Sequence, residues 1–145
     1  MTNIFITGGA GFLGWKLVKN LLSETDSRLY LLVRQNSRKS VRERIEELIN
    51  KSYSRKKRKE IRSRIEVVKG DITEKNLGMK RVQIEELSKK INRIYHSAAL
   101  CEFNAAMPII RKINVAGTKN VLDFALKCKK SGQFTSFHHI STVAI

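Results

Sequence analysis

Short apolar segments alternate with longer segments in which apolar residues recur every three or four positions. The short segments are rich in β-branched and aliphatic residues, which is typical of strands buried in a sheet. The predicted strands are Asn3–Thr7, Arg28–Val33, Ile65–Val68, Ile91–His96 and Phe134–Ile140. Helical spacing predicts helices from Phe12 onward, within 37–64, and over Ile84–Lys90 and Ala105–Lys129.

Two of these helices have apolar faces that we expect to turn toward the core. In the first helix the face consists of Phe12, Leu13, Leu17, Val18, Leu21 and Leu22. In the last helix it consists of Ile109, Ile113, Ala116, Val121, Phe124 and Ala125. Pro108 falls in the first turn of that last helix, where proline is tolerated because the N–H there has no helical partner.

Strands and helices alternate along the whole chain, which predicts an α/β fold with a Rossmann-like doubly wound parallel sheet. We expect right-handed crossovers and the strand order 3-2-1-4-5 in a single domain, 1–145, that is truncated after the fifth strand. The exposed edge of that fifth strand would offer a route to a homodimer.

Size and composition fit a protein of this class. The chain has 145 residues, of which 41% are hydrophobic, enough for an ordinary core. No apolar run approaches the ~18 residues that span a bilayer, and the N-terminus lacks the pattern of a signal peptide. Cys101 and Cys128 have neither a disulfide nor a metal-ligand spacing. We therefore expect a soluble, cytoplasmic protein without a metal site.

Much of the net charge of +16 is local. Residues 34–64 carry 13 Lys or Arg against 4 Asp or Glu, and the insert 37–64 is expected to form two helices with one apolar stripe, Val41, Ile45, Leu48 and Ile49. The run 55–59 could hold nucleic acid or an anionic membrane surface. Because no aromatic residues interleave the run, we favour a solvated helix face, with nucleic-acid binding as a remote alternative.

A glycine-rich turn follows the first predicted strand and opens the first predicted helix. It matches two spacings at once, G-x-G-x-x-G and T-G-x-x-G-x-x-G. Glycine allows the sharp turn and lets the backbone approach a pyrophosphate, which then faces the positive end of the helix. We expect a dinucleotide site formed by Thr7, Gly8, Gly9, Gly11, Phe12, Leu13 and Gly14. The alternative is a purely structural tight turn.

The end of the second strand indicates which dinucleotide binds. NAD-dependent enzymes usually have an acid there for the ribose 2′-OH, whereas this chain has Arg34, with Arg38 and Lys39 nearby. Arg34 could pair with a 2′-phosphate, so NADP is favoured over NAD; the alternative is a surface arginine. Asp71 and Ile72 close the third strand, where Asp71 could border the adenine or serve as an N-cap or turn residue.

Later motifs occur in the order of a known family. They are Gly70-Asp71-Ile72, Tyr95-His96-Ser97-Ala98-Ala99, Asn114-Val115-Ala116-Gly117-Thr118 and His139-Ile140-Ser141-Thr142-Val143. With the glycine turn, these motifs resemble the extended short-chain dehydrogenases/reductases. The basic insert, the His-Ser-Ala-Ala stretch and the Ser-Thr pair resemble their thioester reductase and fatty acyl-CoA reductase branch.

The resemblance implies roles for individual residues. Ala98 and Ala99 would lie against the cofactor, and Asn114 would support the active-site region. Thr142 would hydrogen-bond the reacting carbonyl, and Ser141 would replace it if the strand register slips by one residue. His96 is interpreted as a packed strand-end residue rather than a catalyst. His138 and His139 are interpreted as strand residues without a third metal ligand.

The family's proton donor, a tyrosine in a Tyr-x-x-x-Lys motif, is missing where the resemblance would place it. Tyr53 and Lys57 have that spacing, but they lie in the basic insert before the third strand, and we interpret the match as accidental. We therefore expect the Tyr/Lys pair of the reductase outside this chain, which alone would be inactive.

The leading hypothesis is the NADP-binding portion of a reductase that acts on a carrier- or CoA-bound acyl thioester. One alternative is a fragment of an NAD-dependent sugar-nucleotide epimerase or dehydratase, against which Arg34 argues. Another is a catalytically silent nucleotide-binding module.

Overall fold

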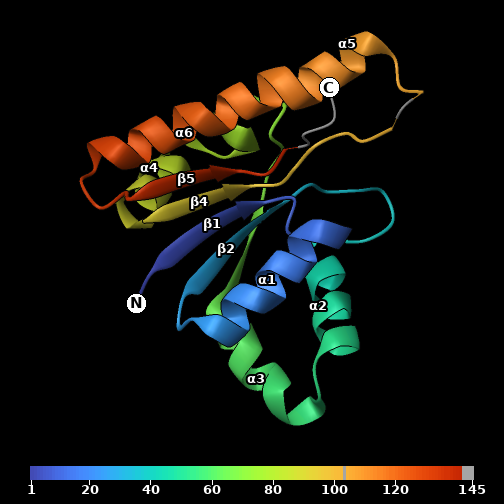
Figure 1. Ribbon diagram of the computed structural model, residues 1–145, viewed down its shortest axis with the longest axis vertical. Helices are drawn as coiled ribbons and strands as arrows, with labels where there is room; N and C mark the ends of the chain where they lie inside the picture. Colours follow the sequence, from blue (N-terminus) through green and yellow to red (C-terminus); the bar gives the residue numbers. More distant parts are fainter. Residues whose placement is uncertain (103, 142–145) are drawn as a thin grey trace.

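The computed structural model describes residues 1–102 and 104–141, which form a five-stranded parallel sheet in the order β3-β2-β1-β4-β5 (Figure 1). The strands are β1 (Asn3–Thr7), β2 (Arg28–Val33), β3 (Ile65–Lys69), β4 (Arg93–His96) and β5 (Ser136–His139). The predicted fold class and strand order are confirmed. The first two strands have the predicted bounds, whereas β4 and β5 are shorter than predicted.

Helices cover both faces of the sheet, as Figure 1 shows. One face carries α1 (Phe12–Glu24), α2 (Val41–Ser52) and α3 (Arg55–Arg64). The other carries α4 (Arg81–Lys90) and α6 (Thr118–Lys130). The remaining elements are the short η1 (Lys75–Gly78) and α5 (Met107–Ile110), and η2 (Arg111–Gly117), a π-helical segment between α5 and α6.

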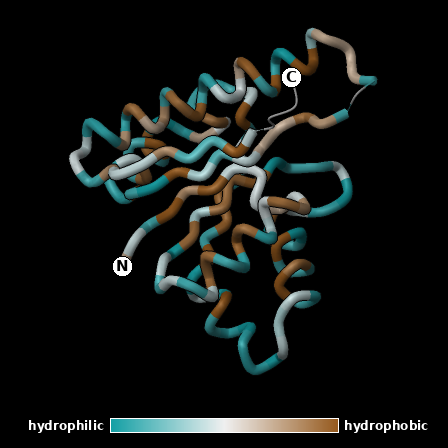
Figure 2. The backbone as a smooth tube through the Cα atoms, in the orientation of Figure 1, coloured by the Kyte–Doolittle hydropathy of each residue, from teal (hydrophilic) through white to brown (hydrophobic). Residues whose placement is uncertain are grey.

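Successive side chains of β1 supply the two cores on either side of the sheet. Ile4 and Ile6 pack with helices α1 to α3, whereas Phe5 packs with α4 and α6. The Phe5 and Phe124 rings lie 4.9 Å apart between centroids. Figure 2 shows β1 and β2 as largely apolar, as expected for strands covered on both faces, whereas β4 and β5 are more polar.

The basic insert contains the two helices that the sequence predicts. Ser40 and Glu43 form a capping box at the start of α2, in which each side chain satisfies the other residue's backbone N–H. The buried residues of α2 are Val41, Ile45 and Ile49, while Leu48 is half-buried. The stripe therefore packs as predicted.

The predicted helix over Ala105–Lys129 is present, but it is not α-helical throughout. The helical segment begins at Met107 and passes through the wider π turns of η2 before it becomes α6. Two residues predicted to face the core, Ile109 and Ala116, are exposed. A π turn holds more residues than an α turn. Residues that are spaced for an α-helix therefore do not stay on one face of the segment across η2.

Two residues of α1 that were expected in the core are exposed as well. Phe12 is 96% exposed and Leu13 is 54% exposed, because they lie in the first turn of the helix, beside the glycine turn. Trp15 is buried instead, and its indole N–H donates to Ser52 Oγ at 2.8 Å, which ties α1 to α2.

Arg64 fastens the end of α3 to the loop between α1 and β2. Its guanidinium donates to the backbone carbonyl of Leu22 at 2.8 Å, to that of Ser27 at 3.2 Å and to that of Thr25. Carbonyl groups at the end of α1 and in the following loop thereby gain a charged donor.

We predict that Arg64→Ala lowers the free energy of unfolding by about 1–3 kcal/mol, because several part-buried carbonyls lose their donor. The control is Arg55→Ala at the exposed start of the same helix, which is expected to change stability by less than about 0.5 kcal/mol. Urea unfolding measures both variants. Equal stabilities of the two variants would contradict the assigned role of Arg64.

Candidate functional site

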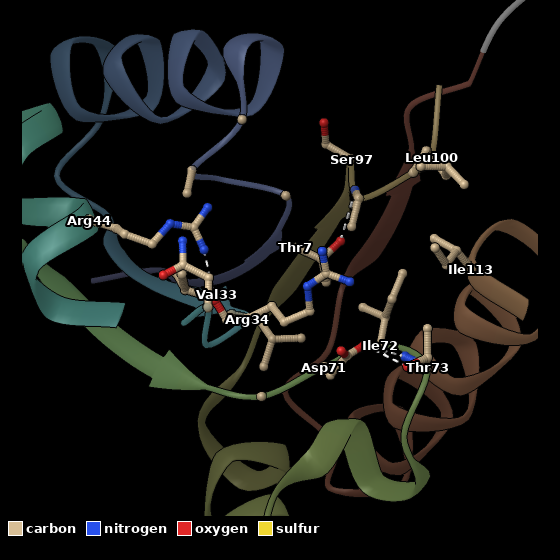
Figure 3. Close-up of a pocket in the computed structure, with 18 residues that line it drawn as sticks. Thr7, Val33, Arg34, Arg44, Asp71, Ile72, Thr73, Ser97, Leu100 and Ile113 are labelled. Carbon is tan, nitrogen blue, oxygen red and sulfur yellow. Dashed lines mark hydrogen bonds between the residues drawn. The ribbon is translucent and has the colours of Figure 1, made fainter. Parts of the chain in front are cut away.

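A cavity of about 370 Å³ lies at the carboxyl ends of the strands, and Figure 3 shows its lining. The lining comes from the glycine turn, the end of β2, the loop after β3, the loop after β4 and Ile113 of η2. The sheet order reverses between β1 and β4, so the cavity lies at the topological switch point, where open α/β sheets bind their ligands.

The glycine turn and the loop after β4 are in close backbone contact. Gly8 has a φ of +73°, and a Cβ atom at this position would lie 2.6 Å from the backbone nitrogen of Ala98. Gly14 packs against the carbonyl of Gly8 so closely that a Cβ atom would overlap it. Both glycines are therefore required by local packing.

The start of α1 lies beside the cavity. Gly11 is the N-cap residue; its own N–H donates to the Gly8 carbonyl at 3.0 Å, and it has no side chain that could cap the first-turn N–H groups. Phe12, Leu13 and Gly14 of that turn are not among the lining residues. Gly11 lines the cavity, and the positive end of the helix dipole favours an anion there. Gly9 packs behind the turn against Leu31 and does not line the cavity.

Arg34 and Arg44 bring two cations to the end of β2. Figure 3 shows the Arg34 side chain extending into the cavity. Arg44 of α2 also lines the cavity, and its Nη1 donates to the backbone carbonyl of Arg34 at 2.7 Å. Arg38 and Lys39 do not line the cavity, and the Lys39 ammonium is paired with Glu47.

Sequence reasoning missed Arg44, because it lies ten positions after Arg34, within the insert. Its position in the sequence could have indicated it, because Arg44 lies one turn into a predicted helix whose buried side includes Val41 and Ile45.

Asp71 is a turn residue that also lines the cavity. Its Oδ1 accepts from the backbone N–H and the hydroxyl of Thr73, both at 2.8 Å. Ile72 and Thr73 complete this part of the lining. Asp71 is the one carboxylate among the described lining residues, so the cavity combines two cations with one hydrogen-bonded acid.

The residues of the motif at the end of β4 have two different positions, some in the cavity lining and one buried behind it. Ala98 and Ala99 line the cavity, whereas His96 is fully buried behind them. Burial and the nearby His139 lower the pKa of His96 to about 4, so its ring is neutral. Asn114 does not line the cavity; its side chain binds the backbone N–H and carbonyl of Leu100 at 2.7 and 3.0 Å.

The hydroxyl of Thr7 is not available to a ligand. It is fully buried and lies 2.6 Å from His96 Nδ1, so Thr7 contributes only its place in the wall. The two candidate catalytic residues follow β5. Ser141 is exposed, and Thr142 lies outside the described residues.

Tyr53 lies at the junction of α2 and α3 and does not line the cavity. Burial raises the pKa of its hydroxyl. Within residues 1–102 and 104–141 there is no group of three His, Cys, Asp or Glu side chains placed to hold a metal ion. No helix in this part of the chain has both the length and the hydropathy that crossing a membrane requires.

A family model described as "Male sterility protein", an NAD-binding family, matches residues 6–145. The chain is 33% identical over 142 residues to a putative fatty acyl-CoA reductase of Drosophila melanogaster, covering 97% of this chain and 26% of the relative. It is 30% identical over 145 residues to fatty acyl-CoA reductase 1 of Mus musculus, covering 97% of this chain and 28% of that relative. The chain thus spans about a quarter of the length of these curated relatives.

Solved structures show the same fold. The terminal R domain of the myxalamid PKS-NRPS pathway has a TM-score of 0.82 and 31% identity, covering 99% of this chain and 36% of that one. The reductase domain of a nonribosomal peptide synthetase from Mycobacterium tuberculosis has a TM-score of 0.78 and 31% identity, covering 99% and 33%. A UDP-glucuronic acid 4-epimerase from Bacillus cereus, at 22% identity and a TM-score of 0.65 with 97% and 40% covered, shares the fold.

Alanine substitutions at Gly8 and Gly132 test whether the close packing at Gly8 shapes the site, with Gly132 as the control. Gly132 also has a positive φ, +89°, but a Cβ atom there would meet nothing within 4 Å. Gly132→Ala is expected to lower the free energy of unfolding only by the backbone strain, about 1–2 kcal/mol, and to leave dinucleotide binding unchanged. Gly8→Ala is expected to cost more and to abolish binding, because the added methyl group pushes Ala98 outward.

Thermal unfolding and calorimetric titration with NADP measure both effects. If Gly8→Ala bound NADP as tightly as Gly132→Ala, the close approach at Gly8 would not shape the site.

Proposed function

The chain belongs to the male sterility protein family of NAD(P)-binding domains, and on this premise we propose that it binds NADP for the reduction of an acyl thioester. The observation that carries the proposal is the pair Arg34 and Arg44, which places two cations in the same cavity as the glycine turn. This pair stands where an acid would select NAD.

Different residues of the cavity fit the pyrophosphate and the 2′-phosphate of NADP. Gly8 and Gly11 line the cavity beside the start of α1, where a pyrophosphate would face the positive end of the helix and Gly9, Phe12, Leu13 and Gly14 complete the turn. Arg34 and Arg44 would hold the 2′-phosphate, since a guanidinium pairs well with phosphate oxygens. Asp71 and Ile72 would border the adenine, and Ala98 and Ala99 the ribose and pyrophosphate.

The proposed reaction is the reduction of a thioester by NADPH bound in this cavity. When bound, NADPH would supply the hydride that reduces the thioester carbonyl. Thr142, or Ser141, would orient that carbonyl, and Asn114 would hold the loop at Leu100 in place. A tyrosine and a lysine from sequence beyond this chain would supply the proton.

A CoA- or carrier-bound acyl group is the substrate class that we favour. The Drosophila and mouse relatives are fatty acyl-CoA reductases, and the two reductase domains come from peptide-synthetase systems. The alternative of an NAD-dependent epimerase agrees less well with the two arginines at the end of β2.

The cofactor preference is tested by calorimetric titration of NADPH and NADH. Arg34→Gln is expected to weaken NADPH binding about 10- to 100-fold, because a charged phosphate partner is lost, and to leave NADH binding nearly unchanged. Arg38→Gln is the control, since Arg38 is exposed and lies outside the cavity lining. Equal or tighter binding of NADH by the unaltered chain would contradict the proposal.

The activity is tested on the protein that this chain forms together with the sequence that follows it in the gene. We expect a Tyr-x-x-x-Lys motif soon after residue 145, and oxidation of NADPH when an acyl-CoA or acyl-carrier thioester is added. Replacing that tyrosine with phenylalanine should remove thioester reduction and retain NADPH binding. A stop codon directly after this chain would instead favour a catalytically silent module.

A further inference from the structure

A series of hydrogen bonds through His96 connects the end of β1, the loop after β4 and η2. The backbone N–H of Ala98 donates to Thr7 Oγ1 at 3.3 Å, and this oxygen lies 2.6 Å from His96 Nδ1. On the other side of the ring, His96 Nε2 lies 2.9 Å from Thr118 Oγ1. The hydroxyl of Thr118 donates to the backbone carbonyl of Asn114 at 2.7 Å.

The donors and acceptors in this series of hydrogen bonds have only one consistent arrangement. The single hydroxyl hydrogen of Thr118 is used by the Asn114 carbonyl, which can only accept. Thr118 Oγ1 must therefore accept from His96 Nε2–H. Thr7 Oγ1 accepts the Ala98 N–H and gives its own hydrogen to His96 Nδ1. With the ring neutral, as its burial favours, we assign its single hydrogen to Nε2.

The surroundings of His96 favour the same neutral form. The side chain is fully buried, and the His139 ring stacks on it with 5.1 Å between centroids. A charged ring would lose hydration and would present a second donor to Thr7, whose own hydrogen would then lose its acceptor.

Both ends of this series of hydrogen bonds reach the loop after β4, one through Thr7 and the other through Asn114. Ala98 lies against Gly8 and lines the cavity directly. Asn114 belongs to η2, and its side chain binds both backbone groups of Leu100, another lining residue. One buried ring therefore connects the glycine turn, the loop after β4 and η2, while His96 itself does not line the cavity.

We propose that His96, as the neutral tautomer with hydrogen on Nε2, is a positioning residue that fixes the loop after β4 between the glycine turn and η2. It acts through Thr7 and Thr118 rather than by touching the cofactor. The inference rests on the proposed dinucleotide site and adds a residue that holds the loop lining this site in position.

The test uses two substitutions at Thr118, which does not line the cavity. Thr118→Val keeps the volume of the side chain and removes only the hydroxyl, so His96 Nε2–H loses its acceptor. Thr118→Ser keeps the hydroxyl and is the matched control. Ring nitrogen NMR shifts of His96 report the tautomer, calorimetry reports NADP affinity, and circular dichroism confirms that each variant is folded.

We expect the unaltered protein and Thr118→Ser to show His96 with hydrogen on Nε2 and similar NADP affinity. Thr118→Val is expected to shift the tautomer and to weaken NADP binding about tenfold, the equivalent of one hydrogen bond. If Thr118→Val does not fold, His96→Gln, which keeps only a donor toward Thr118, is expected to weaken binding to a similar extent.

Two outcomes would overturn the inference while the proposed function stands. One is a His96 ring with its hydrogen on Nδ1 in the unaltered protein, and the other is unchanged NADP affinity in a folded Thr118→Val variant. Failure of the unaltered protein to bind NADP would overturn both the proposed function and the positioning role.

Discussion

The backbone contact between Gly8 and Ala98 is the constraint on which the rest of the site depends. No side chain fits at this crossing, because even a methyl group would lie 2.6 Å from the Ala98 nitrogen. The contact brings the carboxyl ends of β1 and β4 together at the switch point of the sheet. It also aims the start of α1 at the cavity, so the same few backbone atoms define the wall and the anion-binding end of the helix.

The large positive charge of the chain is divided among different roles. Arg58, Arg62 and Arg64 are bound to backbone carbonyls or to Glu46, so they hold α3 in place. Arg34 and Arg44 line the cavity and leave their charge available to a ligand. Composition alone treats all of these residues as equivalent cations, whereas their hydrogen bonds and positions separate the structural charges from those that line the cavity.

Much of the fold could be predicted because the signals are local. Alternating apolar segments indicated the strands, and the spacing of the glycines indicated both the turn and its ligand class. The π turns of η2 could not be predicted, because Asn114 and Gly117 are held by tertiary contacts to Leu100 and Ile72. The role of the Thr7 hydroxyl was equally hidden, since it depends on a histidine that lies far away in the sequence.

The most direct test of a specific NADP site is a titration of the isotopically labelled chain with NADPH, followed by backbone amide NMR shifts. We predict the largest shifts over 8–14, at Arg34 and Asp71, and over 97–100, with little change in α3. Shifts confined to the exposed lysines and arginines of α3 would contradict it, because the dinucleotide would then bind only as an anion on a basic surface.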